Sequence, residues 1–199
     1  MMLAQEQLEK IKDFAIDLDW NSAFEGKSKG NRHLFRIVQK ARDLAKHRDA
    51  DITDLDIRII EAGAWLHDTN LEQTISGSTL ANKNKVLKFL EEIRVSKTDA
   101  ERILHCIEAH DGRILAETTE AKIVHDADTL EKMGPLGIIR ETWKRSQEGW
   151  NTEKIIKHLK SHLRKREAKL YTQKAKITAK RLNDDLIHFF KTVNEQIRE

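Results

Sequence analysis

The sequence predicts an all-α protein, and three observations lead to that prediction. Its 199 residues include one proline, Pro135, and eight glycines, too few turn formers for a many-stranded sandwich or barrel. Apolar residues recur every three or four positions along most of the chain, and no segment alternates as a strand does. Charged residues make up 35% and hydrophobic residues 39%, which suits solvated helices around one core. At this length we expect a single domain over residues 1–199.

The first half of the chain divides into amphipathic helices separated by polar loops. Thr53 and Asp54 are suited to cap the third of these helices. We expect loops over residues 21–30 and around residues 76–78, where glycine and serine gather. The four helices are built on the apolar sets Ile11–Leu18, Ile37–Ala45, Leu55–Leu66 and Val86–Ile93.

The second half carries clearer start and stop signals. Thr98-x-x-Glu101 has the form of a capping box and predicts the start of a helix that ends at Asp111-Gly112. Another helix is expected from about residue 119, and Gly134-Pro135 ends it and begins the next. The last helix carries an apolar stripe that we expect to form a core face and that also suits packing in a homodimer. The stripe consists of Ala175, Ala179, Leu182, Leu186, Phe189, Val193 and Ile197.

Composition narrows the class of protein. The lone cysteine, Cys106, cannot form the internal disulfide bonds that stabilise many secreted proteins, so we expect a reducing, cytoplasmic location. No apolar run approaches the roughly 20 residues that span a bilayer, so no membrane partner is expected. Residues 144–199 hold 15 basic and 7 acidic side chains, a net charge of +8, whereas the remainder is acidic. This basic region is a nucleic-acid surface, a region that attracts phosphorylated small molecules, or a solvated helical face, and we favour the solvated face.

Five polar residues stand where apolar helix faces begin or end. His67-Asp68 closes an apolar helical run, and His33 and His110 lie at predicted helix ends. Asp128 lies on a helix side that should face inward, where an acid needs a partner or a metal. Neutral imidazole with carboxylate is a donor set for Mn²⁺, Fe²⁺, Co²⁺, Ni²⁺ or Zn²⁺. Because the last turn of a helix can relax, His67 and Asp68 can converge on one ion.

Other candidate residues have less specific surroundings. His158 and His162 lie four residues apart on one helical face, but neighbouring lysines and arginines oppose cation binding, so we expect solvated side chains. Five further cations could contact phosphate, although solvated helix surface is the favoured interpretation for them. They are Lys83, Lys85, Arg140, Lys176 and Arg181.

The order of these residues resembles that of the HD-domain metal-dependent phosphohydrolases. H-x-x-R appears at His33 to Arg36, the helix AGAWL leads into the HD pair, and KIVHDADTLEKMGPLGIIR is similar to the DAD segment of small bacterial and archaeal members. The run KLYTQKAKITAKRLNDDLIHFF is similar to their C-terminal tail, so the resemblance extends from about His33 to the end. It implies an all-α, single-domain multi-helix bundle with the metal site among the helices. The metal-site core would span about residues 30–140, and the C-terminal helices, about 150–199, would pack on the same domain.

The resemblance also implies which residues bind the metal. His33, His67, Asp68 and Asp128 would ligate the divalent ion, whose identity the sequence leaves open among Mn, Fe, Co, Ni and Zn. Asp126 would instead cap backbone groups or support a ligand.

Further roles follow from the same resemblance. Asp68 or Glu72, four residues after it, would activate water. His110 would bind substrate phosphate or ligate a second ion, and Arg36 would contact phosphate.

The implied function is hydrolysis of a phosphoester or phosphoanhydride, with a nucleotide as the expected small-molecule substrate. A phosphodiesterase acting on cyclic or short oligonucleotides is the alternative if His110 ligates a second ion. A non-catalytic nucleic-acid-binding or regulatory helical module is the alternative from another class, supported by the basic C-terminal region. We favour the phosphorylated small molecule over nucleic acid.

Overall fold

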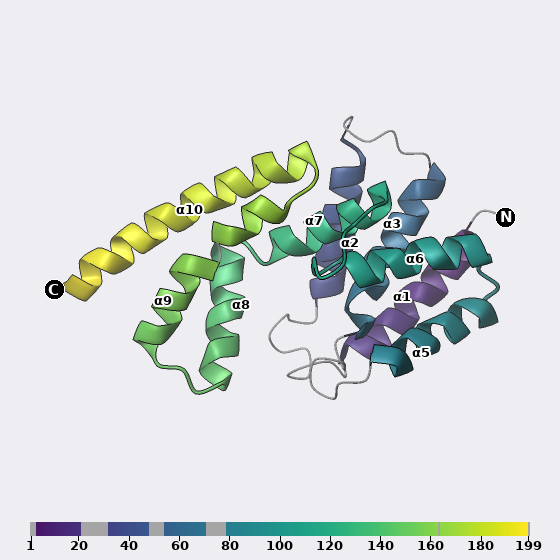
Figure 1. Ribbon diagram of the computed structural model, residues 1–199, viewed down its shortest axis with the longest axis horizontal. Helices are drawn as coiled ribbons and strands as arrows, with labels where there is room; N and C mark the ends of the chain where they lie inside the picture. The colour runs from purple at the N-terminus through teal and green to yellow at the C-terminus, as the bar shows by residue number, and fades with distance from the viewer. Residues whose placement is uncertain (1–2, 21–31, 48–53, 71–78, 163, 199) are drawn as a thin grey trace.

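The computed structural model describes residues 3–20, 32–47, 54–70, 79–162 and 164–198, and within these ranges it contains helices and no strand (Figure 1). The all-α prediction is therefore confirmed. The predicted loops at 21–30 and 76–78 and the Thr53 cap lie outside the described residues. The elements are α1 (Gln5–Trp20), α2 (His33–Ala45), α3 (Asp54–Leu66), η2 (His67–Asn70), α5 (Thr79–Glu92), α6 (Lys97–Ala109), α7 (Thr119–Glu131), α8 (Gly134–Gln147), α9 (Thr152–His162), η3 (Arg164–Lys169) and α10 (Gln173–Arg198).

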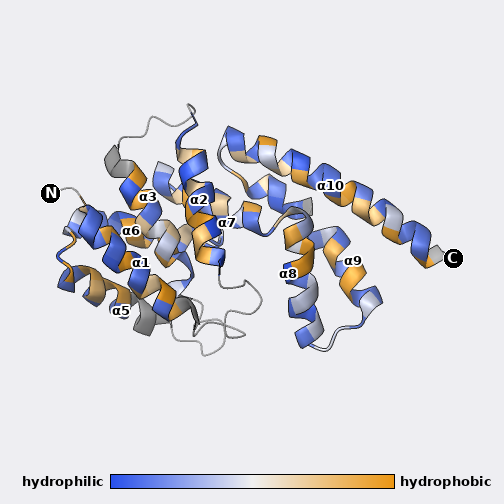
Figure 2. Cartoon of the chain, turned by 180° about the vertical axis from the view of Figure 1, so that it is seen from behind, coloured by the Kyte–Doolittle hydropathy of each residue, from blue (hydrophilic) through white to orange (hydrophobic). Residues whose placement is uncertain are grey.

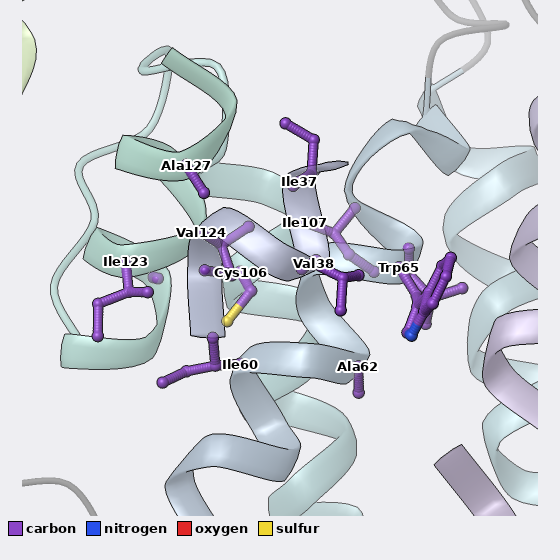
Figure 3. Close-up of a cluster of buried hydrophobic side chains, with 14 of the residues drawn as sticks. Ile37, Val38, Ile60, Ala62, Trp65, Cys106, Ile107, Ile123, Val124 and Ala127 are labelled. Atoms are coloured by element: carbon purple, nitrogen blue, oxygen red, sulfur yellow. The ribbon is translucent and has the colours of Figure 1, made fainter. Parts of the chain in front are cut away.

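Helix α3 lies at the centre of the main body, in contact with α1, α2, α6 and α7. Every residue from 59 to 68 is buried, as expected for a helix surrounded by others. Figure 3 shows the packing, in which Ile60 and Trp65 of α3 meet side chains of α2, α6 and α7. Because α3 is enclosed on several sides, its C-terminal end delivers His67 and Asp68 into the interior.

Helix α3 packs closely against α6 at Gly63, a residue without a side chain. A Cβ atom added to Gly63 would lie 2.5 Å from Cys106 Cβ and 3.0 Å from Cys106 Sγ. Glycine at this position therefore sets how closely α3 approaches α6. Cys106 is fully buried in this contact, and burial raises the pKa of its thiol.

Helix α6 begins at a different cap from the predicted one. The side chain of Ser96 accepts a hydrogen bond from the backbone N–H of Asp99, and Ser96 Oγ donates to Asp99 Oδ2 over 2.8 Å. The predicted Thr98-x-x-Glu101 box is wrong by two residues. Ser96 has the extended backbone that a cap requires, whereas Thr98 is already inside the helix. Gly134-Pro135 begins α8 as predicted.

The apolar stripe of the last helix is buried over only part of its length. Ala175 and Leu186 are fully buried, but Phe189 is 41% exposed and Ile197 is 58% exposed. Phe190 is buried instead, in a small second core formed by α8, α9 and α10. The expected stripe thus fails in its second half, because there α10 extends past the main body (Figures 1 and 2). Among the described helices, none is long and apolar enough to cross a membrane.

Two buried residues of α7 hold the segment that leads into α10. Asp126 Oδ1 accepts a hydrogen bond from the Tyr171 N–H over 2.9 Å, and Oδ2 accepts from the N–H and hydroxyl of Thr172, each over 2.7 Å. His125 Nε2 lies 3.2 Å from the carbonyl oxygen of Lys169. Asp126 therefore has the capping role, one of the two expected for it, and it joins the C-terminal region to the main body.

Gly63→Ala is expected to destabilise the fold by about 1–3 kcal/mol, because the added methyl group overlaps Cys106 and forces α3 and α6 apart. Urea unfolding of the purified variant measures this loss. The double variant Gly63→Ala/Cys106→Gly lacks the Cβ atom of Cys106 that the added methyl group would overlap. Its loss of unfolding free energy should therefore be smaller than the sum of the losses in the two single variants. Strict additivity would contradict the proposed contact.

Candidate metal centre

The four predicted metal ligands come from the ends of three helices. His33 is the first residue of α2, His67 and Asp68 begin η2 after α3, and Asp128 lies in the last turn of α7. All four side chains are buried, and both imidazoles are 0% exposed. The chain thus places two imidazoles and two carboxylates inside an otherwise apolar body.

Three of these side chains meet at one point. The Nε2 atoms of His33 and His67 are 3.2 Å apart, and Asp68 Oδ2 lies 3.1 Å from the first and 3.2 Å from the second. Asp128 lies slightly further out, with its Oδ1 atom 3.8 Å from His67 Nε2. His67 and Asp68 converge because the α-helix ends at Leu66 and a tighter 3-10 turn takes over.

Backbone hydrogen bonds set the tautomers of two histidines. His67 Nδ1 lies 2.7 Å from the carbonyl oxygen of Ala64, and His110 Nδ1 lies 2.6 Å from that of Ile107. A carbonyl oxygen only accepts, so each Nδ1 carries a proton and each neutral ring presents a lone pair at Nε2. Metal-binding histidines in proteins are oriented in this way.

The electrostatics of the site favour a further cation. Within the described part of the chain, Asp128 Oδ1 is buried without a hydrogen-bond partner, while Lys132 pairs with Oδ2. Burial opposes a charge on His67, but Asp68 and Asp128 raise the pKa of His67 above its ordinary value. An unpartnered buried oxygen is costly, and two imidazoles with two carboxylates suit a divalent transition metal. The residues present therefore fit the ion that the sequence resemblance implies.

His110 lies at the edge of this group, at the C-terminal end of α6. Its Nε2 atom is 3.9 Å from Asp68 Oδ1, and its ring centroid is 5.3 Å from that of His67. Burial lowers the pKa of His110 below its ordinary value, so the ring is neutral near pH 7. A neutral ring whose Nδ1 already donates offers Nε2 as an acceptor, which suits a metal ligand or a base better than a phosphate-binding cation.

Glu131, to which the sequence analysis gave no role, is the centre of a buried charge network. Its side chain is 0% exposed at the end of α7. Arg36 Nε donates to its Oε1 atom, Lys40 Nζ lies 3.2 Å from Oε2, and Arg140 Nη1 lies 3.9 Å from Oε1. Burial opposes the negative charge, yet His33, Arg36 and Lys40 lower the pKa of Glu131 to about 2.

Glu131 also contacts the metal cluster. Its Oε1 atom lies 3.8 Å from Nδ1 of His33, on the opposite side of the imidazole from the Nε2 atom that faces Asp68. Glu131 is therefore placed to orient His33. A sequence signal for it exists: Glu131 is three residues after Asp128, so both share one helix face.

The remaining predicted residues have mixed outcomes. Arg36 is one-third exposed and donates to Glu131, and its expected phosphate contact stays a prediction. Glu72 lies outside the described residues. Arg140 was expected on the solvated surface, but its side chain is only 14% exposed because it packs beside Glu131.

His158 and His162 are not the solvated side chains that the sequence suggests. His158 Nε2 lies 2.9 Å from Glu141 Oε1, and the two histidine rings stack with centroids 4.7 Å apart. Arg166 Nη2 lies 2.7 Å from His162 Nε2, while Arg145 donates to Glu141. Burial and Arg166 lower the pKa of His162 to about 4. The ligand atoms of Glu141, His158 and His162 lie within 4.8 Å of one another, so this group could hold a metal ion. Arg145 and Arg166 bond two of these side chains, and the expected opposition of neighbouring cations to metal binding stays a prediction.

Comparison with known proteins supports a shared fold. No protein-family model matches the sequence, and no curated protein matches it either. A solved protein of Lactobacillus plantarum is 22% identical over 99% of both chains, with a TM-score of 0.77. An HD-superfamily hydrolase of Bacillus thuringiensis is 24% identical over 98% of both chains, with a TM-score of 0.76. Bacillus subtilis YpgQ, solved in complex with ADP, is 22% identical over 96% of this chain and 98% of its own, with a TM-score of 0.73.

Glu131→Gln is expected to destabilise the protein by about 1–3 kcal/mol at pH 7, because it leaves the partly buried Arg36, Lys40 and Arg140 without their shared anion. The folded pKa of about 2 lies below the ordinary 4.5, so wild-type stability falls as pH drops from about 4.5 towards about 2. The variant should lack the part of this dependence that Glu131 contributes, so the stability difference between wild type and variant should shrink at low pH. Urea unfolding at pH 7 and at about pH 3 measures both effects.

The matched control is Glu92→Gln, which removes an exposed carboxylate 3.9 Å from Lys88. We expect its stability to change by less than about 0.5 kcal/mol. Equal losses in the two variants would contradict the role of the buried network.

Proposed function

We propose, from the fold that this chain shares with an HD-superfamily hydrolase, that the protein is a metal-dependent phosphohydrolase. The observation that carries the proposal is the convergence of His33, His67 and Asp68 beside an unpartnered oxygen of Asp128. The bond to be hydrolysed is a phosphoester or a phosphoanhydride, in keeping with the sequence resemblance.

His33, His67, Asp68 and Asp128 would hold one divalent ion. A bound ion supplies a Lewis acid, which acidifies water and offsets charge on phosphoryl oxygens. The chain's own contribution is to fix the donor atoms. The backbone hydrogen bond of His67 sets its ring, and Glu131 lies behind the ring of His33.

Asp68 and His110 are our candidates for the base that accepts the proton of an attacking water molecule. Asp68 directs Oδ2 at the imidazoles, whereas its Oδ1 atom lies 3.9 Å from His110 Nε2. As the water oxygen forms its bond to phosphorus, its proton passes to one of these bases, and the leaving oxygen departs with the electrons of the broken bond. Glu72 is a second candidate for the base, from its position four residues after Asp68.

Arg36 and Lys132 place positive charge beside the site. They pair with Glu131 and Asp128, and their side chains are 33% and 28% exposed. A phosphorylated substrate can therefore reach both cations. Positioned cations stabilise the charge on a transferring phosphoryl group, and Arg36 is our candidate for this contact.

A nucleotide is the substrate class that we favour, because the neighbouring YpgQ was solved in complex with ADP. The basic C-terminal region is weaker support for a nucleic-acid-binding module. Within that region, Tyr171 and Thr172 are bonded to Asp126, and the first half of α10 contributes Ala175 and Ala179 to the main core.

A phosphodiesterase is the second candidate function. Asp68 has Oδ2 in the three-residue cluster and Oδ1 near His110, so one carboxylate could bridge two ions. Two metal ions about 3.5–4 Å apart are the usual arrangement for phosphodiester cleavage.

Asp68→Ala is expected to lower the rate of phosphate or pyrophosphate release by at least about a hundredfold, because it removes both a ligand and a base. The assay is a nucleotide panel with Mn²⁺, Co²⁺ or Ni²⁺, and circular dichroism checks that the fold persists. The matched control, Asp184→Ala on the exposed side of α10, should retain wild-type activity. Full activity of Asp68→Ala would refute the assignment.

His110→Ala separates the two candidate functions. For the phosphohydrolase we expect one ion per chain in both wild type and variant, with a lower kcat in the variant because a base is lost. Metal content by mass spectrometry gives the count. Two ions in wild type and one in His110→Ala would instead support the phosphodiesterase.

A further inference from the structure

A groove away from the metal centre lies between α2, the end of α7 and the first half of α10. It has a volume of about 360 Å³. A second hollow of about 270 Å³ continues it past Leu44 and Lys174 to Lys122. We call the two together the basic groove. The residues on which the inference rests are Lys40, Leu44, Leu130, Lys174, Ile177 and Arg181.

The basic groove carries an excess of positive charge. Lys40, Lys122, Lys174 and Arg181 line it, and Asp43 is the one acid among the described lining residues. Within the described part of the chain, Lys122, Lys174 and Arg181 form no ion pair. Elsewhere this chain pairs many of its cations, as on α8, where two glutamates contact one arginine. Unpaired cations around a hollow attract an anion.

The floor of the groove is apolar. Leu44 and Leu130 are almost fully buried beneath it, and Ile177 is 56% exposed at its side. An exposed isoleucine among cations offers contact to an apolar group of the same ligand. A volume of about 360 Å³ suits a small molecule, and nearby charged groups can fix its orientation.

The groove is separate from the metal centre. His33 and Lys40 are seven residues apart on α2, which places them about 10 Å apart along the helix. Glu131 lies between them, with Oε2 3.2 Å from Lys40 Nζ and Oε1 3.8 Å from His33 Nδ1. A ligand in the groove therefore lies on the Lys40 side of Glu131, whereas His33 and Asp68 lie on the other side.

We propose that the basic groove is a second binding site that takes an organic phosphate of the nucleoside phosphate class. Lys174 and Arg181, seven residues or about two turns apart on α10, contact the phosphate groups, and Lys40 faces them from α2. The nucleoside part lies against Leu130 and Ile177. This site stands on its own observations and does not depend on the proposed function.

The test is calorimetric titration of the full chain with ADP, inorganic triphosphate and adenosine, in EDTA and at low salt. Without a metal ion, Asp68 and Asp128 disfavour anions at the metal centre, and the double variants described next assign the binding to the groove. We expect one site for ADP, with at least tenfold weaker binding of triphosphate and of adenosine. Ile177→Ala should weaken ADP several-fold and leave triphosphate unchanged.

Charge-matched double variants locate the site. Lys174→Gln/Arg181→Gln should weaken ADP at least tenfold. Lys176→Gln/Lys180→Gln removes the same charge from exposed positions of α10 outside the groove, and should stay within twofold of wild type. Thermal unfolding confirms that both variants are folded.

Three outcomes would overturn the proposal. Equal weakening in the two double variants would indicate diffuse attraction rather than a site. Triphosphate binding as tight as ADP would indicate an anion contact without a nucleoside subsite. A single-stranded oligonucleotide that binds more tightly than ADP, with the same sensitivity to Lys174→Gln/Arg181→Gln, would indicate a nucleic-acid surface.

Discussion

Helix α7 carries Asp128 and Glu131 into the body one turn apart, and the compensation of these two buried charges organises the helices around them. A buried carboxylate is tolerated only when it is paired or bound to a metal. Asp128 faces His67 of η2, and Glu131 faces His33 and cations of α2 and a cation of α8. Side chains of three elements, α2, η2 and α8, therefore meet at α7, and removal of either acid would leave its partners uncompensated.

Much of the fold could be predicted from the sequence, because helical periodicity and local stop signals are properties of short segments. Most of the described helices agree with expected ones, including the start of α8 at Gly134, although α6 begins at another cap and α9 and η3 were not delimited from the sequence. The proposed ligands could also be identified from the sequence. His67 and Asp68 stand at the end of an apolar run, and Asp128 interrupts an apolar face. Each is a polar residue next to or within an apolar stretch, and this signal can be recognised without knowledge of the tertiary structure.

The features that could not be predicted depend on which helices come together. Phe190 rather than Phe189 is buried, since the rotation of α10 there is set by α8 and α9. His158 lies against Glu141 of another helix, and nothing in its own segment indicates that partner. The network of Glu131 likewise joins residues far apart in the sequence. Its charged neighbours look like ordinary helix surface until the helices are packed.

The close contact between α3 and α6 at Gly63 lies one turn before two histidines of the site. Gly63 precedes His67 by four residues, Cys106 precedes His110 by four, and the two rings have centroids 5.3 Å apart. The width of the site on this side is thus set by two positions that have no polar role in it. During divergence, a side chain gained at position 63 would require a smaller one at position 106. The two positions are therefore expected to change together, and a glycine without chemistry of its own constrains which substitutions the chain can accept.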